Sequence, residues 1–117
     1  MLATSWNIRK AIQYQMQLSG KIFSSVTDIG IEIVGKSTHF TTFRGMRATP
    51  GSAGTTTIQL EIDGAAITGA TLSWASTDPA YELKEVSISQ TIEAGQRISF
   101  RTTSAETNAR DIYTEID

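Results

Sequence analysis

The chain has 117 residues, a length that suits one domain with a single modest core. It contains no cysteine, which excludes disulfides, thiolate metal sites and a cysteine nucleophile, and its net charge of −2 argues against general nucleic-acid binding. Threonine (17 residues) and serine (12 residues) are frequent, and threonine favours half-exposed strands, so the composition predicts β structure.

The N-terminal segment 1–25 is predicted to be an anchoring region that holds an arm and the first strand. Its beginning lacks the apolar core of a signal peptide, and no apolar run reaches the roughly 18 residues of a membrane span. In the segment 12–19, apolar residues alternate with glutamine or serine, which favours a half-buried strand over about 10–19. Residues 1–8 are expected to form an arm or a short helical turn, and residues 26–117 the main domain.

Two further strands are expected in the first half of that domain. The isoleucines of segment 29–34 occupy every second position, which predicts a strand with all three on one face. The aromatic and threonine-rich segment 39–48 predicts the next strand. Phe40 and Phe43 are three positions apart and would face opposite sides of a regular strand, so a bulge or twist between them is expected. Residues 49–54 contain a proline and two glycines and are predicted to form a loop.

A β-hairpin is predicted in the middle of the chain. In segment 57–63, isoleucine or leucine at every second position alternates with polar residues, as in a half-buried strand. Asp63 and Gly64 follow, and an Asp-Gly pair tolerates positive φ at both positions of a type I′ turn. Residues 65–67 would form a short return strand.

The remaining strands follow at regular intervals. Apolar alternation recurs at Leu72 and Trp74 and in the segments 81–90, 97–102 and 112–116, with turn residues between them. No segment has a convincing helical period. About eight short strands with turns every 8–12 residues predict an all-β fold, a two-sheet antiparallel β-sandwich or jelly roll.

Two segments carry a resemblance to known proteins. The segment 43–64 reads as a strand, a Gly/Ser/Thr loop and a threonine-rich strand that ends in the Asp-Gly hairpin. The segment 93–116 begins with a Glu-Ala-Gly-Gln-Arg turn, continues with an Ile-Ser-Phe strand and ends in the final strand. This order resembles a module of tailed-bacteriophage structural proteins, and the resemblance covers roughly residues 38–117. Gln96 departs from the module, in which an acidic residue is more usual at this place.

The resemblance implies a non-catalytic virion protein, made in the host bacterial cytoplasm and placed on the outer surface of the virion. The first expectation is a capsid decoration or cement protein that binds the major capsid protein and copies of itself, with a trimer as first guess because capsid lattices offer threefold sites. The alternatives are a tail, baseplate or fibre accessory protein and a carbohydrate-binding module. No cofactor, metal, nucleic acid or membrane partner is expected.

The candidate partner-binding residues are aromatic, apolar and basic. Residues 1–50 carry a charge balance of +4 and residues 51–117 one of −6, which fits either solvated strand faces or a basic N-terminal part that docks on an acidic neighbour. Trp74 and Tyr81 flank a loop and suit stacking on a sugar or filling a partner pocket, although Trp74 is also in phase with the core. The predicted partner-binding residues are Trp6, Ile8, Arg9, Lys10, Arg44, Arg47, Trp74 and Tyr81.

No catalytic or metal site is predicted. His39 is the sole histidine and is expected to be structural, since no second histidine or cysteine is present to bind zinc with it. Glu61 and Asp63 share a strand face, as any alternating polar residues do, so they are not taken as the catalytic carboxylate pair of a glycosidase. Asp63 and Asp78 could bind calcium, but their spacing matches no known calcium loop.

Two arginines are expected to form ion pairs. Arg97 and Arg101 lie four residues apart, with Ser99 between them on the same face, and therefore share one face of a strand. Cross-strand pairs with Glu82 or Glu115 are one expectation, and salt bridges between subunits are the alternative.

Overall fold

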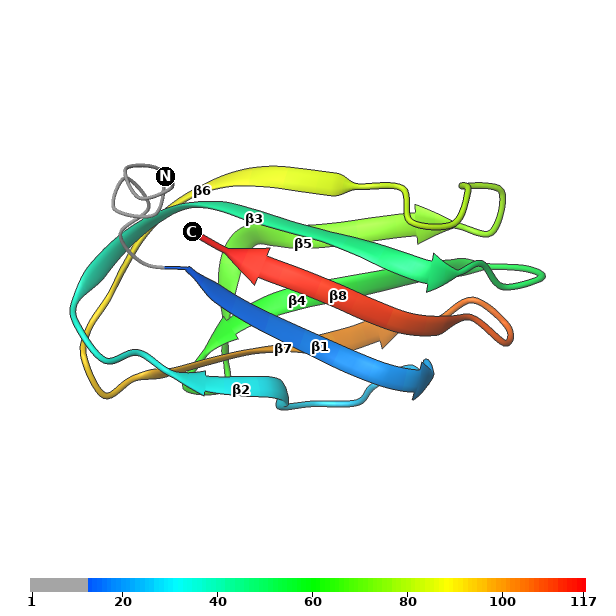
Figure 1. Cartoon of the computed structure of the whole chain (residues 1–117). Helices are drawn as coiled ribbons and strands as arrows, with labels where there is room; N and C mark the ends of the chain where they lie inside the picture. Colours follow the sequence, from blue (N-terminus) through cyan, green and yellow to red (C-terminus); the bar gives the residue numbers. More distant parts are fainter. Residues whose placement is uncertain (1–12) are drawn as a thin grey trace, which may run out of the picture.

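The computed structural model describes residues 13–117, and over this range the chain forms eight β-strands and no helix (Figure 1). The strands form two four-stranded sheets in which every neighbouring pair is antiparallel. The predicted eight-stranded sandwich is therefore confirmed. The strands are β1 (Tyr14–Lys21), β2 (Ile29–Ile33), β3 (Thr38–Thr49), β4 (Thr55–Ile62), β5 (Ala65–Ala75), β6 (Lys84–Ile92), β7 (Arg97–Ser104) and β8 (Arg110–Ile116).

Most strand pairs join segments that are distant in the sequence. The first sheet has the order β1-β8-β3-β6 and the second the order β2-β7-β4-β5, so only β4 and β5 are both consecutive and paired. Figure 1 shows β1 alongside the C-terminal strand β8. Because β1 is a paired strand of the first sheet, the described part of segment 1–25 belongs to the sandwich itself.

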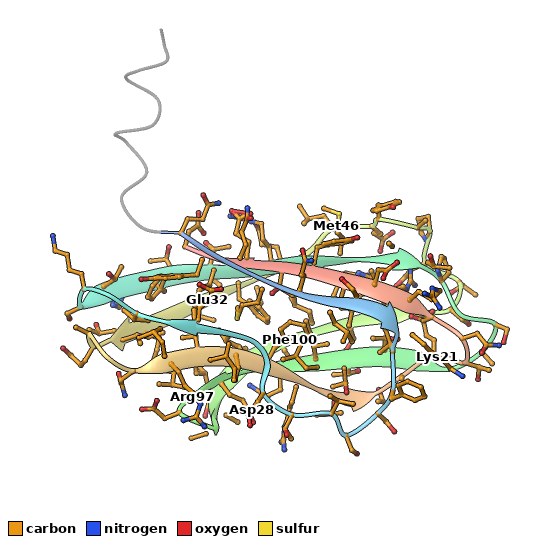
Figure 2. All side chains as sticks on the ribbon, turned by 60° about the horizontal axis from the view of Figure 1, so that its bottom comes forward. Lys21, Asp28, Glu32, Met46, Arg97 and Phe100 are labelled. Carbon is orange, nitrogen blue, oxygen red and sulfur yellow. The ribbon has the colours of Figure 1, made fainter. Side chains whose placement is uncertain are left out.

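Side chains that point inward from both sheets form one hydrophobic core. Its largest members are Trp74 and three phenylalanines, Phe40, Phe43 and Phe100, all of them fully buried. Figure 2 shows Phe100 between the two sheets. Burial of each such side chain contributes about 1.5–3 kcal/mol, which makes the alternation of apolar residues along the strands the main determinant of the fold.

Of the bulge or twist predicted between Phe40 and Phe43, the structure has a bulge. The register of β3 against β6 shifts between Phe40 and Thr42, and the backbone N–H groups of Thr41 and Thr42 both donate to the carbonyl oxygen of Asp117, each at 2.9 Å. The extra residue changes the parity of the strand. Both phenylalanines therefore reach the core although they lie three positions apart.

The expectation that the three isoleucines of β2 lie on one face is wrong. Ile29 is buried, whereas Ile31 and Ile33 are 48% and 60% exposed and Val34 is buried in their place. The register against β7 shifts between Ile29 and Glu32, and Gly30 adopts a φ of 65°. After this irregularity, the residues of β2 that face the core and those that face solvent exchange places. Ile31 and Ile33 therefore point to solvent.

The hairpin turn forms as predicted, but its return strand is longer. Asp63 and Gly64 have φ values of 50° and 84°, as a type I′ turn requires. The following strand β5 runs without a break from Ala65 to Ala75, rather than ending at residue 67, because a further bulge near Gly69 lets it continue along β4. The strand expected from residue 81 begins at Lys84, since Tyr81 adopts a positive φ of 62° in the connection.

Candidate binding surface on the first sheet

The predicted partner-binding residues are not gathered in one place. Trp6, Ile8, Arg9 and Lys10 lie outside the described residues. The other four divide into two fully buried side chains, Arg47 and Trp74, and two that reach the surface, Arg44 and Tyr81.

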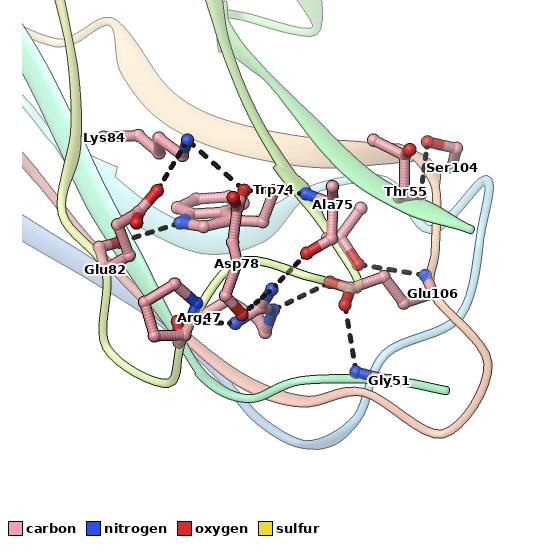
Figure 3. Close-up of polar contacts among 12 residues, drawn as sticks. Arg47, Gly51, Thr55, Trp74, Ala75, Asp78, Glu82, Lys84, Ser104 and Glu106 are labelled. Carbon is pink, nitrogen blue, oxygen red and sulfur yellow. Dashed lines mark hydrogen bonds and ion pairs between the residues drawn. The ribbon is translucent and has the colours of Figure 1, made fainter. Parts of the chain in front are cut away.

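Arg47 points into the protein and is fully buried. Its Nε donates to Oε1 of Glu106 at 2.7 Å, and its Nη atoms donate to the carbonyl oxygens of Ala75 (2.7 Å), Pro79 (3.2 Å) and Asp78 (3.3 Å) (Figure 3). A buried charge is tolerated when it is paired and its donors are used, and this guanidinium satisfies both conditions. The structure thus places Arg47 in the interior, where its side chain offers no surface to a partner.

Glu106 completes this cluster by fixing a second loop. Its other carboxylate oxygen accepts the backbone N–H of Gly51 at 2.9 Å, and its own backbone N–H donates to Oγ1 of Thr56 at 3.0 Å. Gly51 is required here because a Cβ at this position would lie 2.5 Å from the Cβ of Glu106. The pair Arg47 and Glu106 therefore holds three connections together at one end of the sandwich.

Trp74 is a core residue, and its indole Nε1 donates to the carbonyl oxygen of Glu82 at 2.9 Å (Figure 3). Its position agrees with the alternation with Leu72 noted in the sequence. Tyr81 is 59% exposed, and its backbone N–H donates to the carbonyl oxygen of Arg47. The two aromatic residues that the sequence placed around one loop therefore do not form a shared platform.

Arg44 occupies a polar row that crosses the outer face of the first sheet. The register aligns Gln15 of β1, Glu115 of β8, Arg44 of β3 and Glu85 of β6 as successive neighbours. The Arg44 guanidinium lies 2.9 Å from Glu85, 3.2 Å from Glu115 and 3.4 Å from Asp117. The hydrogen bond to Glu85, with the nearby Asp117 and Glu115 carboxylates, raises the pKa of Arg44 above its ordinary value, against a smaller opposing effect of burial.

An apolar row lies beside the polar one. Its apolar members are Tyr113 of β8 and Met46, which lies opposite Tyr113 on β3. Gln17 of β1 lies opposite Tyr113 on the other side and forms the polar end of the row. Leu83, just before β6, extends this row. Figure 2 shows Met46 on the outer side of the first sheet, away from the core.

The two rows border an open pocket of about 270 Å³. Within the described part of the chain, the side-chain amides of Gln15 and Gln17 and the hydroxyl of Tyr113 make no hydrogen bond. Sequence reasoning placed these glutamines on the polar face of a strand but did not recognise a site. The available signal was the repeat of an amide at every second position of the first strand. The lining residues are Gln15, Met16, Gln17, Arg44, Gly45, Met46, Leu83, Tyr113, Thr114 and Glu115.

A second pocket of about 410 Å³ lies where β5 begins, next to β6. Its lining residues carry neither charged nor aromatic side chains, so it offers little for specific recognition. The residues are Ile62, Ala65, Ala66, Ile67, Thr68, Ile88, Ser89 and Gln90.

The sole histidine makes structural contacts. His39 is exposed, and its ring nitrogens lie 2.9 Å from Oγ1 of Thr91 and 3.2 Å from Oγ of Ser89. No group of three or more histidine, aspartate or glutamate side chains that suits a metal ion is found among residues 13–117. No helix with the length and apolarity needed to cross a membrane occurs in that range either.

The arginines of β7 form ion pairs, but with other carboxylates than expected. Arg97 lies 3.7 Å from Asp28 and 4.0 Å from Asp63, and Arg101 lies 3.3 Å from Glu61, rather than meeting Glu82 or Glu115. The difference arises because β7 belongs to the second sheet, whereas Glu115 lies on the first. Figure 2 shows Arg97 and Asp28 close together.

The carboxylates considered for calcium binding are held in turns. The backbone N–H of Arg97 donates to Asp63 at 3.0 Å and lowers the pKa of that carboxyl, to which the side chain of Gln96 and the charge of Arg97 also contribute. The backbone N–H of Ala75 donates to Asp78 at 2.8 Å and, with Lys84, lowers the pKa of Asp78. Asp63 therefore ties its hairpin to the start of β7, and Asp78 closes its own turn.

Comparisons with known proteins support the fold. No protein-family model matches the chain, and no curated protein matches it. Among solved structures, the C-terminal domain of EclA, described as a sugar-binding protein, superposes with a TM-score of 0.58 at 15% identity, over 92% of this chain and 80% of that one. The Eiger TNF of S. frugiperda superposes with a TM-score of 0.50 at 12% identity, over 90% of this chain and 92% of that one. At these identities the likeness shows a shared β-sandwich fold, in proteins named for binding or as a cytokine rather than as enzymes.

Proposed function

We propose that the chain is a non-catalytic virion structural protein of a tailed bacteriophage, and that it decorates or cements the capsid through protein–protein contacts. The observation that carries this proposal is the resemblance of the strand-and-turn module in residues 38–117. In the structure the two segments that carry the resemblance, 43–64 and 93–116, lie on the strands β3, β4, β7 and β8, which make up the centre of both sheets. A rigid sandwich of this kind suits a mechanical role.

The β1 and β2 side of the sandwich supports the contact role. Both are edge strands, and an edge presents unpaired backbone groups that favour association with another chain. Phe23, just after β1, and Ile31 and Ile33 of β2 are exposed apolar side chains of the kind that protein interfaces bury. The N-terminal residues 1–10 precede β1, and in the proposal they anchor the protein on the shell or on a neighbouring copy.

In this proposal the function is the buried surface that each copy adds to the shell. Multiplied over the lattice, these contacts raise the barrier to rupture when packaged DNA pressurises the capsid. A homotrimer remains the first expectation for the assembled state. A tail, baseplate or fibre protein would use the same fold and differ in location and copy number.

Copy number per particle tests the proposal. Virions purified from a strain that carries the coding sequence are analysed by quantitative mass spectrometry against the major capsid protein. On the order of hundreds of copies is the expected result, because only the capsid repeats a site so often. About a dozen copies would move the protein to the tail, and absence from purified virions would overturn the proposal.

A substitution tests the contact surface directly. Ile33→Lys places a charge on the exposed face of β2 and is expected to weaken particle binding or self-association while leaving the unfolding free energy within about 0.5 kcal/mol. Thr68→Lys, on the exposed face of β5 in the same sheet, is the matched control. Sedimentation of purified protein and a particle pull-down measure the two effects, and equal behaviour of both variants would contradict the assignment of this surface.

A further inference from the structure

The outer face of the first sheet carries a pocket that the proposed structural role does not use. We propose that the pocket bordered by Gln17, Tyr113 and Met46 binds a neutral saccharide. The expected ligand is one or two sugar rings, or the end of a longer uncharged glycan. The proposal stands independently of where the protein sits in a particle.

The apolar row provides a surface for one face of a sugar ring. Tyr113 is 40% exposed and points away from the core, and Met46 and Leu83 continue its surface on one side. The C–H groups of a pyranose ring form an apolar face that packs against such a ring and its aliphatic neighbours. Charged or strongly hydrated ligands would gain little from this strip.

The polar groups around the strip are arranged for hydroxyl groups. Gln15 and Gln17 lie two residues apart on β1, so their amides are roughly 6.5–7 Å apart along the strand. Each amide offers two donors and one acceptor, and neither is used by another group among residues 13–117. A ring placed on Tyr113 therefore has the amide of Gln17 directly beside it and that of Gln15 diagonally behind it.

The charges of the polar row disfavour anionic ligands. The single cation Arg44 is held by three carboxylates, Glu85, Glu115 and Asp117. The row therefore keeps an excess of negative charge, which repels phosphate, sulfate and uronate groups. Carboxylate oxygens fixed by an arginine are instead good acceptors for sugar hydroxyl groups.

The dimensions favour a small ligand over a protein partner. The pocket of about 270 Å³ is slightly below the roughly 300 Å³ at which typical small-molecule sites begin. A stable protein interface buries about 800 Å² on each partner, whereas the apolar part here is a single row of side chains. The surface is thus adequate for a terminal sugar and small for a second copy.

The test begins with a printed array of neutral gluco-, manno- and galacto-oligosaccharides together with sialylated and sulfated glycans. The full-length protein is expected to retain neutral members only. The best neutral oligosaccharide is then titrated calorimetrically, with an expected dissociation constant on the order of 0.1–1 mM because the site is open. Retention of anionic glycans alone, or of no glycan at all, would overturn the proposal.

Substitutions assign the binding to this pocket. Tyr113→Ala and Gln17→Leu are each expected to weaken binding about tenfold, and Tyr113→Phe less, because it keeps the ring. Tyr81→Ala is the matched control, since Tyr81 is an exposed aromatic outside the pocket. Thermal unfolding confirms that each variant is folded, and Gln17→Leu keeps the test decisive if Tyr113→Ala is unstable. Binding that persists in both pocket variants would refute the site.

Discussion

Substitution of Arg47 by methionine tests how the buried charge cluster holds the fold together. Methionine retains much of the length of the side chain but removes the guanidinium. Glu106 would then keep a carboxylate in the interior with only the backbone N–H of Gly51 as a donor. The carbonyl oxygens of Ala75, Pro79 and Asp78 would also lose the donor that they share.

The expected loss of stability is large for a single substitution. Removing one partner of a buried ion pair costs about 3–5 kcal/mol, because the other charge stays behind without compensation. A domain of this size has a total stability of about 5–15 kcal/mol, so Arg47→Met is expected to be folded but marginal. The double variant Arg47→Met, Glu106→Leu removes both charges and is expected to be less destabilised than the sum of the two single changes, by about 1–3 kcal/mol.

Urea unfolding followed by far-ultraviolet circular dichroism measures these free energies. Arg44→Met is the matched control, since Arg44 is a partly exposed arginine on the same strand whose ion pairs are screened by water. It is expected to cost about 1 kcal/mol or less. The reasoning would be refuted if the two arginine variants were equally stable, or if the double variant showed simple additivity.

Two further substitutions have expected outcomes. Gly30→Ala should lower the free energy of unfolding by about 2–4 kcal/mol, because φ is 65° there and the new Cβ would lie 2.6 Å from the Cβ of Met16. The control Gly35→Ala places its Cβ where no atom lies within 4 Å and should be nearly neutral. Equal urea midpoints of the two variants would contradict this reasoning. Asp63 has a pKa below its ordinary value of 3.8 because the backbone N–H of Arg97 donates to it. Its ionised form therefore stabilises the folded protein above about pH 3.8, and this contribution is lost as the pH falls through the lower folded-state pKa. Asp63→Asn should lose less thermal stability between pH 6 and pH 3 than the unchanged protein, and identical acid dependence would refute the role of this carboxylate.

The candidate site was only partly visible in the sequence. Arg44 and Arg47 were grouped as surface residues because they are charged, although positions three apart in a strand face opposite sides. Phe43, which is in phase with Arg47, is buried, and strand parity alone would have put Arg47 inside. Strand alternation does not predict which residue pairs with Arg47, because Glu106 lies 59 residues away in another connection.

The residues of the outer pocket could not be grouped from the sequence either. Gln17 and Tyr113 are each ordinary outward-facing residues on their own strands. They become neighbours only because β1 and β8, the first and last strands, pair with Tyr14 opposite Ile116. A shift of that register by one residue would turn Gln17 or Tyr113 toward the core.

The sequence by itself determined the approximate places of most strands, the irregularity between Phe40 and Phe43 and the turn at Asp63, because alternation and turn chemistry depend on neighbouring residues alone. It did not determine the full length of β5 or the start of β6. Only the tertiary structure decided the strand order and the direction of the isoleucines of β2. It also decided which carboxylate meets each arginine and which side chains share the outer pocket. These features depend on pairing between segments distant in the chain, and that pairing is selected by the packing of the whole core rather than by any local pattern.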